Sequence, residues 1–287
     1  MNDYLIITDS SCDLSSDFAK DLGVKVIGLE FIIDGEESKA NGAIDEKQFY
    51  EILRSGKMVT TSAIAMDRFI SEVEPTLADG RDVLYLGFSS GLSSTYNAGF
   101  VGAQELSEKY PDRKIYTVDT LAASMGQGLL VWYAANMKKE GKSIEEVRDF
   151  VENNKLNLAH WFTVNDLFFL KRGGRVSAAT ALVGTMLSIK PVMHVDDEGH
   201  LTKVTTARGR KNSIDALFAK AKESAIDAAG QTMFISHGDC IEDAEYLAAK
   251  LKDELGVKEV IISYVGPVIG AHSGPGTLAL FFIGTNR

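Results

Sequence analysis

The apolar run Val83-Leu84-Tyr85-Leu86-Gly87-Phe88 is followed directly by the polar turn Ser89-Ser90-Gly91-Leu92-Ser93-Ser94-Thr95. A short apolar run bounded by turn residues is typical of a strand buried on both faces of a sheet. After the serines, apolar residues recur at helical spacing, at Tyr96, Phe100, Ala103, Leu106 and Tyr110. Because a strand, a turn and an amphipathic helix follow one another, this stretch predicts one unit of a parallel α/β sheet.

Similar units lie on both sides of this stretch. Further strands are predicted at Tyr4–Thr8, Lys25–Ile33 and Ile115–Val118. Helical patterns lie between or after them: one ends near Leu22, and the others cover Phe49–Leu53, Phe69–Leu77, Leu129–Met137 and Ile144–Asn153. We therefore predict an N-terminal α/β domain with a parallel sheet over residues 1–157.

The second half of the chain has a different pattern. Pro191–Val195 and Leu201–Thr205 flank Asp196-Asp197-Glu198-Gly199, which predicts a β-hairpin. The elements predicted after it are helices at Ser213–Ala228 and Ala244–Leu255, and strands at Met233–Ser236, Glu259–Val265 and Thr277–Gly284. A hairpin combined with strand-helix units predicts a C-terminal α/β domain with a mixed or antiparallel sheet over residues 158–287.

Composition and charge exclude several classes of protein. The 287 residues carry 30 Lys+Arg against 40 Asp+Glu, a net charge of −10, so general nucleic-acid binding is not expected. Cys12 and Cys240 are too few and too distant for a disulfide framework, which fits a reducing compartment. No secretory signal is recognisable, and polar residues or prolines interrupt the uncharged stretches 120–137 and 261–286. We expect a cytoplasmic protein with at most transient membrane contact.

Charge is also distributed unevenly. Residues 160–215 carry a net charge of +3, which leaves −13 for the remainder of the chain. This difference is either scattered surface charge or a local docking site for an anion or an acidic partner.

The serine-rich turn has two interpretations. A helix N-terminus after a parallel strand offers unpaired N–H groups to an anion, and the hydroxyls of Ser93 or Ser94 add donors. Alternatively, the serines only cap the helix. Thr60-Thr61-Ser62 poses the same choice ahead of the Phe69 helix, and on its own it is best explained as a cap. Asp9-Ser10-Ser11 and Asp119-Thr120 occupy equivalent turns, where they line the same cleft or satisfy turn backbone.

The remaining motifs favour binding over catalysis. The glycine-dense run Gly266–Gly276 contains His272, an imidazole that could donate to an anion or be structural. A P-loop, a dinucleotide fingerprint and a Gly-x-Ser-x-Gly elbow are absent, and the five histidines lack metal-ligand spacing. We therefore expect no cofactor and no metal.

Six stretches in order resemble motifs of the DegV family, bacterial fatty-acid-binding proteins that include the lipid-carrying subunit of fatty acid kinase. The stretches that carry this resemblance are Thr8–Leu14, Ser89–Tyr96, Val118–Thr120, Met125–Gly128, Leu170–Arg175 and Gly266–Gly276. The resemblance implies a two-domain fold with one long-chain fatty acid between the domains, its acyl chain in an apolar tunnel.

The resemblance also assigns site residues. It implies that the fatty-acid carboxylate is bound by Thr61, Ser62, Ser93 and His272. The cleft would be lined by Ser10, Ser94, Thr120, Gly126 and Gly270, and a kinase partner would face Arg172 and Arg208. Ala63-Ile64-Ala65 departs from the x-Pro-Ser that usually follows Thr-Ser in the family, which leaves open which hydroxyl binds.

Three functions are weighed on this basis. The first is a non-catalytic fatty-acid carrier that presents its ligand to a fatty acid kinase for ATP-dependent phosphorylation to an acyl phosphate. The second is an acyl or ester hydrolase that uses a serine of the 89–94 turn together with His272. The third is a regulator that binds a small anion or nucleotide at the helix N-terminus and the basic segment 160–215.

Overall fold

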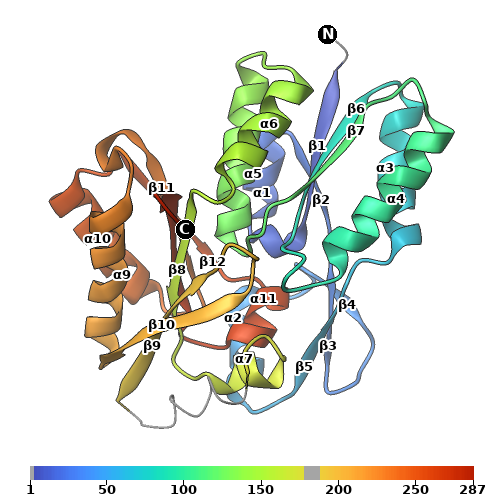
Figure 1. Ribbon diagram of the computed structural model, residues 1–287. Helices are drawn as coiled ribbons and strands as arrows, with labels where there is room; N and C mark the ends of the chain where they lie inside the picture. The colour runs from blue at the N-terminus through green and yellow to red at the C-terminus, as the bar shows by residue number, and fades with distance from the viewer. Residues whose placement is uncertain (1–2, 178–187) are drawn as a thin grey trace.

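Four strands form a fully parallel sheet in the order β2-β1-β6-β7 in the computed structural model, which describes residues 3–177 and 188–287 (Figure 1). The strands are β1 (Tyr4–Asp9), β2 (Val24–Ile27), β6 (Asp82–Gly87) and β7 (Ile115–Asp119). Side chains alternate between its two faces, so Ile6 and Leu84 pack with one group of helices and Ile7 and Val83 with another. The first group is α1 (Ser16–Leu22), α5 (Met125–Lys139) and α6 (Ile144–Asn154), and the second is α3 (Met66–Ala78) and α4 (Thr95–Lys109).

The second half forms a mixed sheet of six strands, in the order β10-β9-β8-β13-β11-β12. Only β11 and β12 pair in parallel among these described strands, and the other four pairs are antiparallel. The strands are β8 (Leu158–Thr163), β9 (Ile189–Val195), β10 (Leu201–Arg208), β11 (Thr232–His237), β12 (Glu259–Tyr264) and β13 (Leu278–Ile283). Its outer face packs on α9 (Arg210–Ser224) and α10 (Ile241–Leu255). The predicted α/β fold with a parallel and a mixed sheet is confirmed.

Helix α5 lies between the two sheets (Figure 1). It is buried almost all round, from Met125 through Ala135, and it contacts β1 and β6 on one side and β8, β11 and β13 on the other. A helix that is apolar on every face must be covered on every face. Residues from both sides of residue 158 therefore share one core around α5. The strands also divide between the sheets at Leu158, where we place the domain boundary, and that boundary stays a prediction.

A small third sheet corrects two predictions. Lys25–Ile33 is not one strand, because after the last pair with β1 (Asp9 with Ile27) the Leu29 amide donates to Ser10 Oγ and the chain leaves the parallel sheet. The chain continues as β3 (Glu30–Ile33), which pairs with β4 (Lys39–Ala40) and β5 (Val59–Ser62). Thr60-Thr61-Ser62 is therefore strand and not a helix cap; Ala65 precedes α3 without a side-chain cap.

Other elements differ from the predicted ones in detail. Strand β8 was not predicted, and Phe100 of the predicted apolar stripe is 42% exposed. The glycine-dense run contains a short helix, α11 (Pro267–Ser273). Two further helices, α2 (Glu46–Arg54) and α7 (Phe168–Arg172), pack against α11. Short 3₁₀ turns lie at Ser10–Cys12 and Ala228–Gly230.

Hydrogen bonds connect the two halves at several places, two of which position α11 and the β9–β10 hairpin. Asp13, fully buried after β1, accepts from the Gly266 amide at 3.0 Å and from Ser124 Oγ at 2.5 Å. Ser89 Oγ donates to the carbonyl of Gly199 at 2.9 Å, so the serine-rich turn holds the tip of the β9–β10 hairpin. These contacts fix the hairpin and α11 relative to the parallel sheet.

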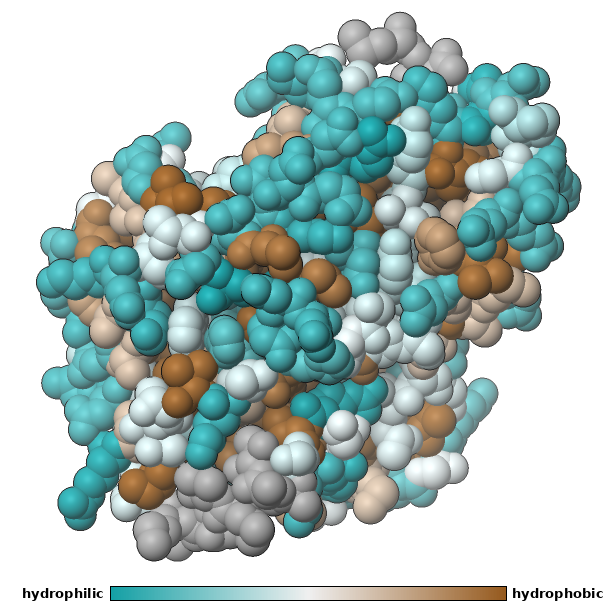
Figure 2. All heavy atoms as spheres, in the orientation of Figure 1, coloured by the Kyte–Doolittle hydropathy of each residue, from teal (hydrophilic) through white to brown (hydrophobic). Residues whose placement is uncertain are grey.

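The face in Figure 2 is mostly hydrophilic, with small apolar groups scattered over it. Among residues 3–177 and 188–287, no helix has the length and apolar character needed to span a membrane.

The buried carboxyl of Asp13 makes stability depend on pH. Burial raises the pKa of Asp13 from its usual 3.8 to about 8. Between these values the unfolded chain releases a proton that the folded chain retains, so this group's contribution to stability is complete at low pH and declines as pH rises toward 8. Asparagine keeps the hydrogen-bonding shape without titrating. We expect the melting temperature of Asp13→Asn, relative to the parent, to rise by a few degrees between pH 5 and pH 8.5.

The matched control is Asp253→Asn, at an exposed position of α10. The difference in melting temperature between this variant and the parent should stay constant over the same pH range. If the melting temperatures of Asp13→Asn and the parent differ by the same amount at every pH in this range, the raised pKa assigned to Asp13 is wrong.

Candidate functional site

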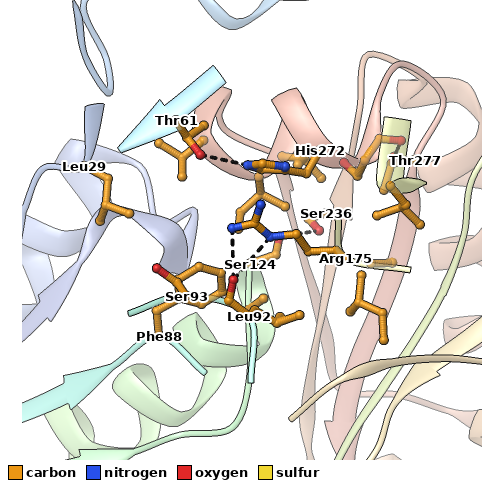
Figure 3. A pocket seen from close by; sticks show the side chains of 18 of the residues that line it. Leu29, Thr61, Phe88, Leu92, Ser93, Ser124, Arg175, Ser236, His272 and Thr277 are labelled. Atoms are coloured by element: carbon orange, nitrogen blue, oxygen red, sulfur yellow. Dashed lines mark hydrogen bonds between the residues drawn. The ribbon is translucent and has the colours of Figure 1, made fainter. Parts of the chain in front are cut away.

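A cavity of about 280 Å³ lies between the parallel and the mixed sheet (Figure 3). Its walls come from the end of β5, the serine-rich turn, the start of α5, strands β8, β11 and β13, and helices α7 and α11. Most of the lining is apolar, and its larger apolar side chains include Leu29, Phe88, Phe162, Leu170, Val268 and Ile269. An apolar cavity with a few convergent polar groups is the usual form of a small-molecule site.

Thr61 and His272 form a hydrogen-bonded pair in the cavity wall, with 2.8 Å between Thr61 Oγ1 and His272 Nε2 (Figure 3). Burial, together with the positive charges of Arg175 and Arg172, lowers the pKa of His272 to about 4, so the ring is neutral at pH 7. When Nε2 carries the proton and donates it to Thr61, the Thr61 hydroxyl is free to donate into the cavity. His272 can thus act by orienting Thr61.

The serine-rich turn contributes the second set of hydroxyls. Ser93 and Ser94 line the cavity, and Ser93 Oγ donates to Thr95 Oγ1 at 2.9 Å. Thr95 Oγ1 also accepts from the Ile64 amide, at 3.3 Å, which ties this turn to the segment that follows Thr61 and Ser62. All four residues predicted to bind a carboxylate, Thr61, Ser62, Ser93 and His272, therefore line one cavity.

Arg175 is a lining residue whose role the sequence did not predict, although it ends the Leu170–Arg175 motif. Its guanidinium donates to the carbonyl of Leu92 from Nε at 3.2 Å and from Nη2 at 3.0 Å, and to the carbonyl of Gly173 from Nη1. Three of its donors are thus used on backbone, and they hold the serine-rich turn against α7. Arg175 thus stabilises the cavity wall through backbone contacts, and the other side-chain donors assigned to a ligand are uncharged hydroxyls.

Four residues predicted to line the cleft lie outside the cavity lining and have other roles among the described residues. Ser10 Oγ accepts the Leu29 amide, and Thr120 Oγ1 donates to the carbonyl of Gly87. Gly126 and Gly270 permit close packing, since a Cβ would lie 2.8 Å from Phe281 in one case and 2.8 Å from the Tyr50 hydroxyl in the other. The side chains of the Asp9-Ser10-Ser11 and Asp119-Thr120 turns therefore hydrogen-bond to backbone groups and do not line the cleft.

The two predicted partner-facing arginines lie in different places. Arg172 ends α7, half-buried beside the cavity, with its guanidinium over the rings of Phe168 and Phe169 at 5.6 and 4.8 Å. Arg208 is exposed at the end of β10 and does not line the cavity. That both face a kinase stays a prediction.

The cavity also contains buried polar groups that the sequence did not reveal. Ser124 and Ser236 lie 2.9 Å apart between their hydroxyl oxygens, and His160 lines the same cavity with no hydrogen-bond partner for Nδ1 in the described chain. Ser236 lies in β11, a strand that is buried throughout. The sequence of such a strand does not indicate which of its residues line a cavity and which pack in the core. The interior is thus more polar than a simple apolar tunnel.

No cluster of three or more His, Cys, Asp or Glu side chains placed to hold a metal ion occurs in the described part of the chain.

The fold and this site define an α/β protein with a largely apolar cavity between a parallel and a mixed sheet. The family model described as "Uncharacterised protein, DegV family" matches residues 4–285. A DegV domain-containing protein of Clostridium perfringens is 46% identical over 289 residues, which cover 100% of this chain and 99% of the relative. One of Streptococcus pyogenes is 36% identical, over 99% of each. The chain belongs to the DegV family.

Solved structures show the same fold. The structure described as "Fatty Acid Binding of a DegV family Protein from Thermus thermophilus" has a TM-score of 0.87 at 30% identity and covers 98% of this chain and 99% of that chain. "DegV, a fatty acid binding protein from Bacillus subtilis" has a TM-score of 0.84 at 27% identity, with the same coverage. A Thermotoga maritima protein, described as revealing fatty acid binding function, has a TM-score of 0.84 at 28% identity.

Gly173 makes the position of His272 testable. A Cβ on Gly173 would lie 2.2 Å from His272 Nδ1, although the backbone itself (φ −72°) accepts alanine. Gly173→Ala should therefore displace the imidazole and break its bond to Thr61, at a cost of about 1–3 kcal/mol typical of overpacking. Urea unfolding measures this cost, and the NMR signals of the His272 ring report the displacement.

Gly28→Ala is the control, because its Cβ would meet only Arg68 Nη2, at 3.9 Å. If Gly173→Ala leaves both stability and the His272 signals at parent values, His272 does not occupy the position described.

Proposed function

We propose that this protein binds one long-chain fatty acid, with the acyl chain in the cavity and the carboxylate at Thr61, Ser62, Ser93 and His272. The observation that carries the proposal is the combination of a mostly apolar cavity with a set of uncharged donors in one part of its wall. Three solved relatives with the same fold, from Thermus thermophilus, Thermotoga maritima and Bacillus subtilis, are described as fatty-acid-binding.

The energetics of such a ligand are consistent with a preformed site. Burial of 14–16 methylenes at ~0.8 kcal/mol each gives roughly 11–13 kcal/mol. Association costs of about 4–15 kcal/mol offset much of this gain. Burying a carboxylate without hydrogen-bond donors would cost several kcal/mol more. The hydroxyls of Thr61 and Ser62 would supply such donors, and so would that of Ser93 once it turns from Thr95 Oγ1 to the ligand.

The uncharged donors also suit a further step. A bidentate arginine would hold both carboxylate oxygens and reduce their nucleophilicity, but Arg175 already donates to two backbone carbonyls. A carboxylate bound by hydroxyls keeps an oxygen able to attack the γ-phosphate of ATP. We infer that the protein is a cytoplasmic, non-catalytic subunit that presents the bound acid to a fatty acid kinase, which supplies the ATP site and yields an acyl phosphate.

Two features beside the cavity support such a partner. Phe168 on α7 is 55% exposed, and Arg172, one turn further along, places a cation over its ring. An exposed aromatic group next to an arginine is typical of the anchors of protein interfaces.

The hydrolase alternative lacks a catalytic arrangement. His272 pairs with Thr61 and not with a serine of the 89–94 turn. Its Nδ1 has no hydrogen-bond partner among the described residues, so no carboxylate orients the ring as in a triad. Labelling of one of these serines by a fluorophosphonate would favour this alternative over the carrier.

The positive charges of the structure give little support to the anion-binding alternative. The basic segment 160–215 contributes Arg175 to the cavity, and its guanidinium is engaged by backbone. A rise in melting temperature with nucleotides or inorganic phosphate, and none with fatty acids, would favour this alternative.

Removal of the hydroxyls should weaken fatty-acid binding without unfolding the protein. We expect Thr61→Val and Ser93→Ala each to lower the affinity for oleate about tenfold, the effect of losing one hydrogen bond to a charged group of about 1.5 kcal/mol. Displacement of a fluorescent fatty acid measures the affinity, and circular dichroism checks the fold.

The matched controls are the neighbours Thr60→Val and Ser90→Ala, which lie outside the cavity lining and should bind oleate like the parent. Unchanged affinity in both Thr61→Val and Ser93→Ala would remove these hydroxyls from the site.

Arg172 should separate lipid binding from presentation. We expect Arg172→Ala to bind oleate within about twofold of the parent, because this arginine does not line the cavity. With the kinase and ATP present, acyl phosphate formation should fall at least about tenfold, as for loss of an interface anchor. Lys258→Ala, an exposed change on another part of the surface, is the control. Full acyl phosphate formation with Arg172→Ala would contradict the role assigned to this residue.

A further inference from the structure

A groove of about 580 Å³ lies along the free edge of β12. Strand β12 ends the mixed sheet, and β11 is its one strand neighbour among the described residues. Four consecutive residues of β12, 261–264, line the groove. Successive side chains of a strand point to opposite faces of the sheet, so a groove that contacts all four residues runs along the edge of the strand.

The backbone at this edge is unpaired. The Val265 amide donates to the carbonyl of His237 on β11. Because backbone groups of a strand alternate in direction, the N–H and C=O groups of Ile262 and Tyr264 point away from β11, toward the free edge. These groups have no hydrogen-bond partner among the described residues. The next outward amide, that of Gly266, donates to the Asp13 carboxyl, and there the unpaired edge ends.

The two edges of the mixed sheet differ in their protection against pairing. An open edge can pair with another chain, and proteins usually protect it with cations, prolines or a bulge. The edge strand β10 has a register shift between Lys203 and Thr205, and it carries Lys203 and Arg208. Strand β12 pairs regularly with β11 over its whole length and has none of these features. Its edge is therefore suited to accept a further strand.

The walls of the groove select a single extended segment. Much of the remaining lining comes from the N-terminal half of the chain, and it includes Leu14, Phe18 and Val26. The edge of β12 is thus recessed between the two halves. In a second folded copy this edge would be recessed in the same way, so the β12 edges of two copies could not meet. A strand that projects from its own protein can enter.

The groove is negatively charged. Its lining contains the carboxyls of Asp13 and Glu46 and, within the described residues, no Lys, Arg or His. Glu46 is half-buried and forms no hydrogen bond or ion pair with another described residue. Burial, together with the negative charges of Asp239, Asp45 and Glu46, raises the pKa of Tyr264, so further carboxylates lie near this end of β12. Lysine or arginine supplies the complementary charge, whereas the carboxylate of a second fatty acid would be repelled.

We propose that this groove is a docking site for a partner protein that contributes an extended segment containing lysine or arginine. The segment adds a seventh strand to the mixed sheet, its backbone pairs with Ile262 and Tyr264, and its cation pairs with Glu46. In strand addition, main-chain hydrogen bonds provide the affinity and side-chain contacts provide the specificity. The docking site shares a wall with the fatty-acid cavity, because Asp13 of the groove bonds to Ser124 of the cavity.

Selection from a random library of blocked heptapeptides on the purified full chain tests the occupant. We expect micromolar binders that contain lysine or arginine. The Ile262 and Tyr264 amides should exchange hydrogen quickly in the free chain and at least about tenfold more slowly with peptide bound, as newly paired groups do. The Ile261 and Ser263 amides, which point to β11, should exchange slowly in both states.

Three outcomes would overturn the proposal. The first is a library without binders, and the second is a set of binders that lack cations or leave the Ile262 and Tyr264 amides unprotected. The third is a dimer of the chain, seen by sedimentation, that the peptides dissociate, because the edge would then belong to a second copy.

Variants test the residues. Glu46→Arg should weaken binding of the selected peptides at least about tenfold, because an attractive pair becomes a like-charge pair. The matched control is Glu51→Arg, at an exposed position of the same helix outside the groove lining, which should bind like the parent. Ile262→Pro removes an outward amide and no bond to β11, so it should abolish binding, with circular dichroism as the check of the fold. Binding at parent affinity by Glu46→Arg, or by folded Ile262→Pro, would contradict the proposed pairing.

Discussion

The structure depends on the burial of α5. Its residues from Met125 to Ala135 are apolar or small on nearly every face, so the helix is stable only when protein surrounds it on all sides. One sheet cannot do this, and the parallel and mixed sheets are therefore held face to face with α5 between them. The cavity lies at the start of this helix, where the side chains of Ala123 and Ser124 are small. The helix holds the two sheets apart, and the cavity occupies space between them beyond the first residues of the helix.

Backbone geometry around this space is unusual and is supported by hydrogen bonds. Ser124 (φ 54°) and Asp13 (φ 53°) both have positive φ values, which are uncommon outside glycine. The bond between their side chains, together with the Gly266 amide on Asp13, stabilises both residues. Non-glycine residues in this region concentrate at functional sites when neighbouring structure over-determines them. Here the same contacts join the parallel sheet, α5 and α11 beside the cavity.

The sequence predicted the fold class and most elements because their signals are local. Buried runs such as Val83–Phe88 and helical stripes such as Phe69–Leu77 lie within one element each. The sequence-based prediction was wrong where a long-range contact determines the structure. Lys25–Ile33 forms two strands, because Ser10 Oγ accepts a hydrogen bond from the Leu29 amide between them. Thr60–Ser62 is part of a strand because it pairs with β3. Periodicity within a segment contains no information about either partner.

The candidate site shows the same division. Thr61, Ser62, Ser93 and His272 were predicted from the resemblance to the DegV family, and the fold brings all four to one cavity. Ser10 and Thr120 belong to similar motifs, yet their hydroxyls satisfy backbone, and a motif alone does not distinguish these roles. Ser236 and His160 gave no signal, because a polar residue in a buried strand acquires its meaning only from the strands beside it.

The central claim is that this chain encloses a fatty acid, and mass spectrometry of the purified protein tests it most directly. Native spectra followed by solvent extraction should show one fatty acid per chain, released only on denaturation, and the extract identifies its chain. A protein that is empty as purified, and that takes up neither oleate nor palmitate when these are added, would contradict the account.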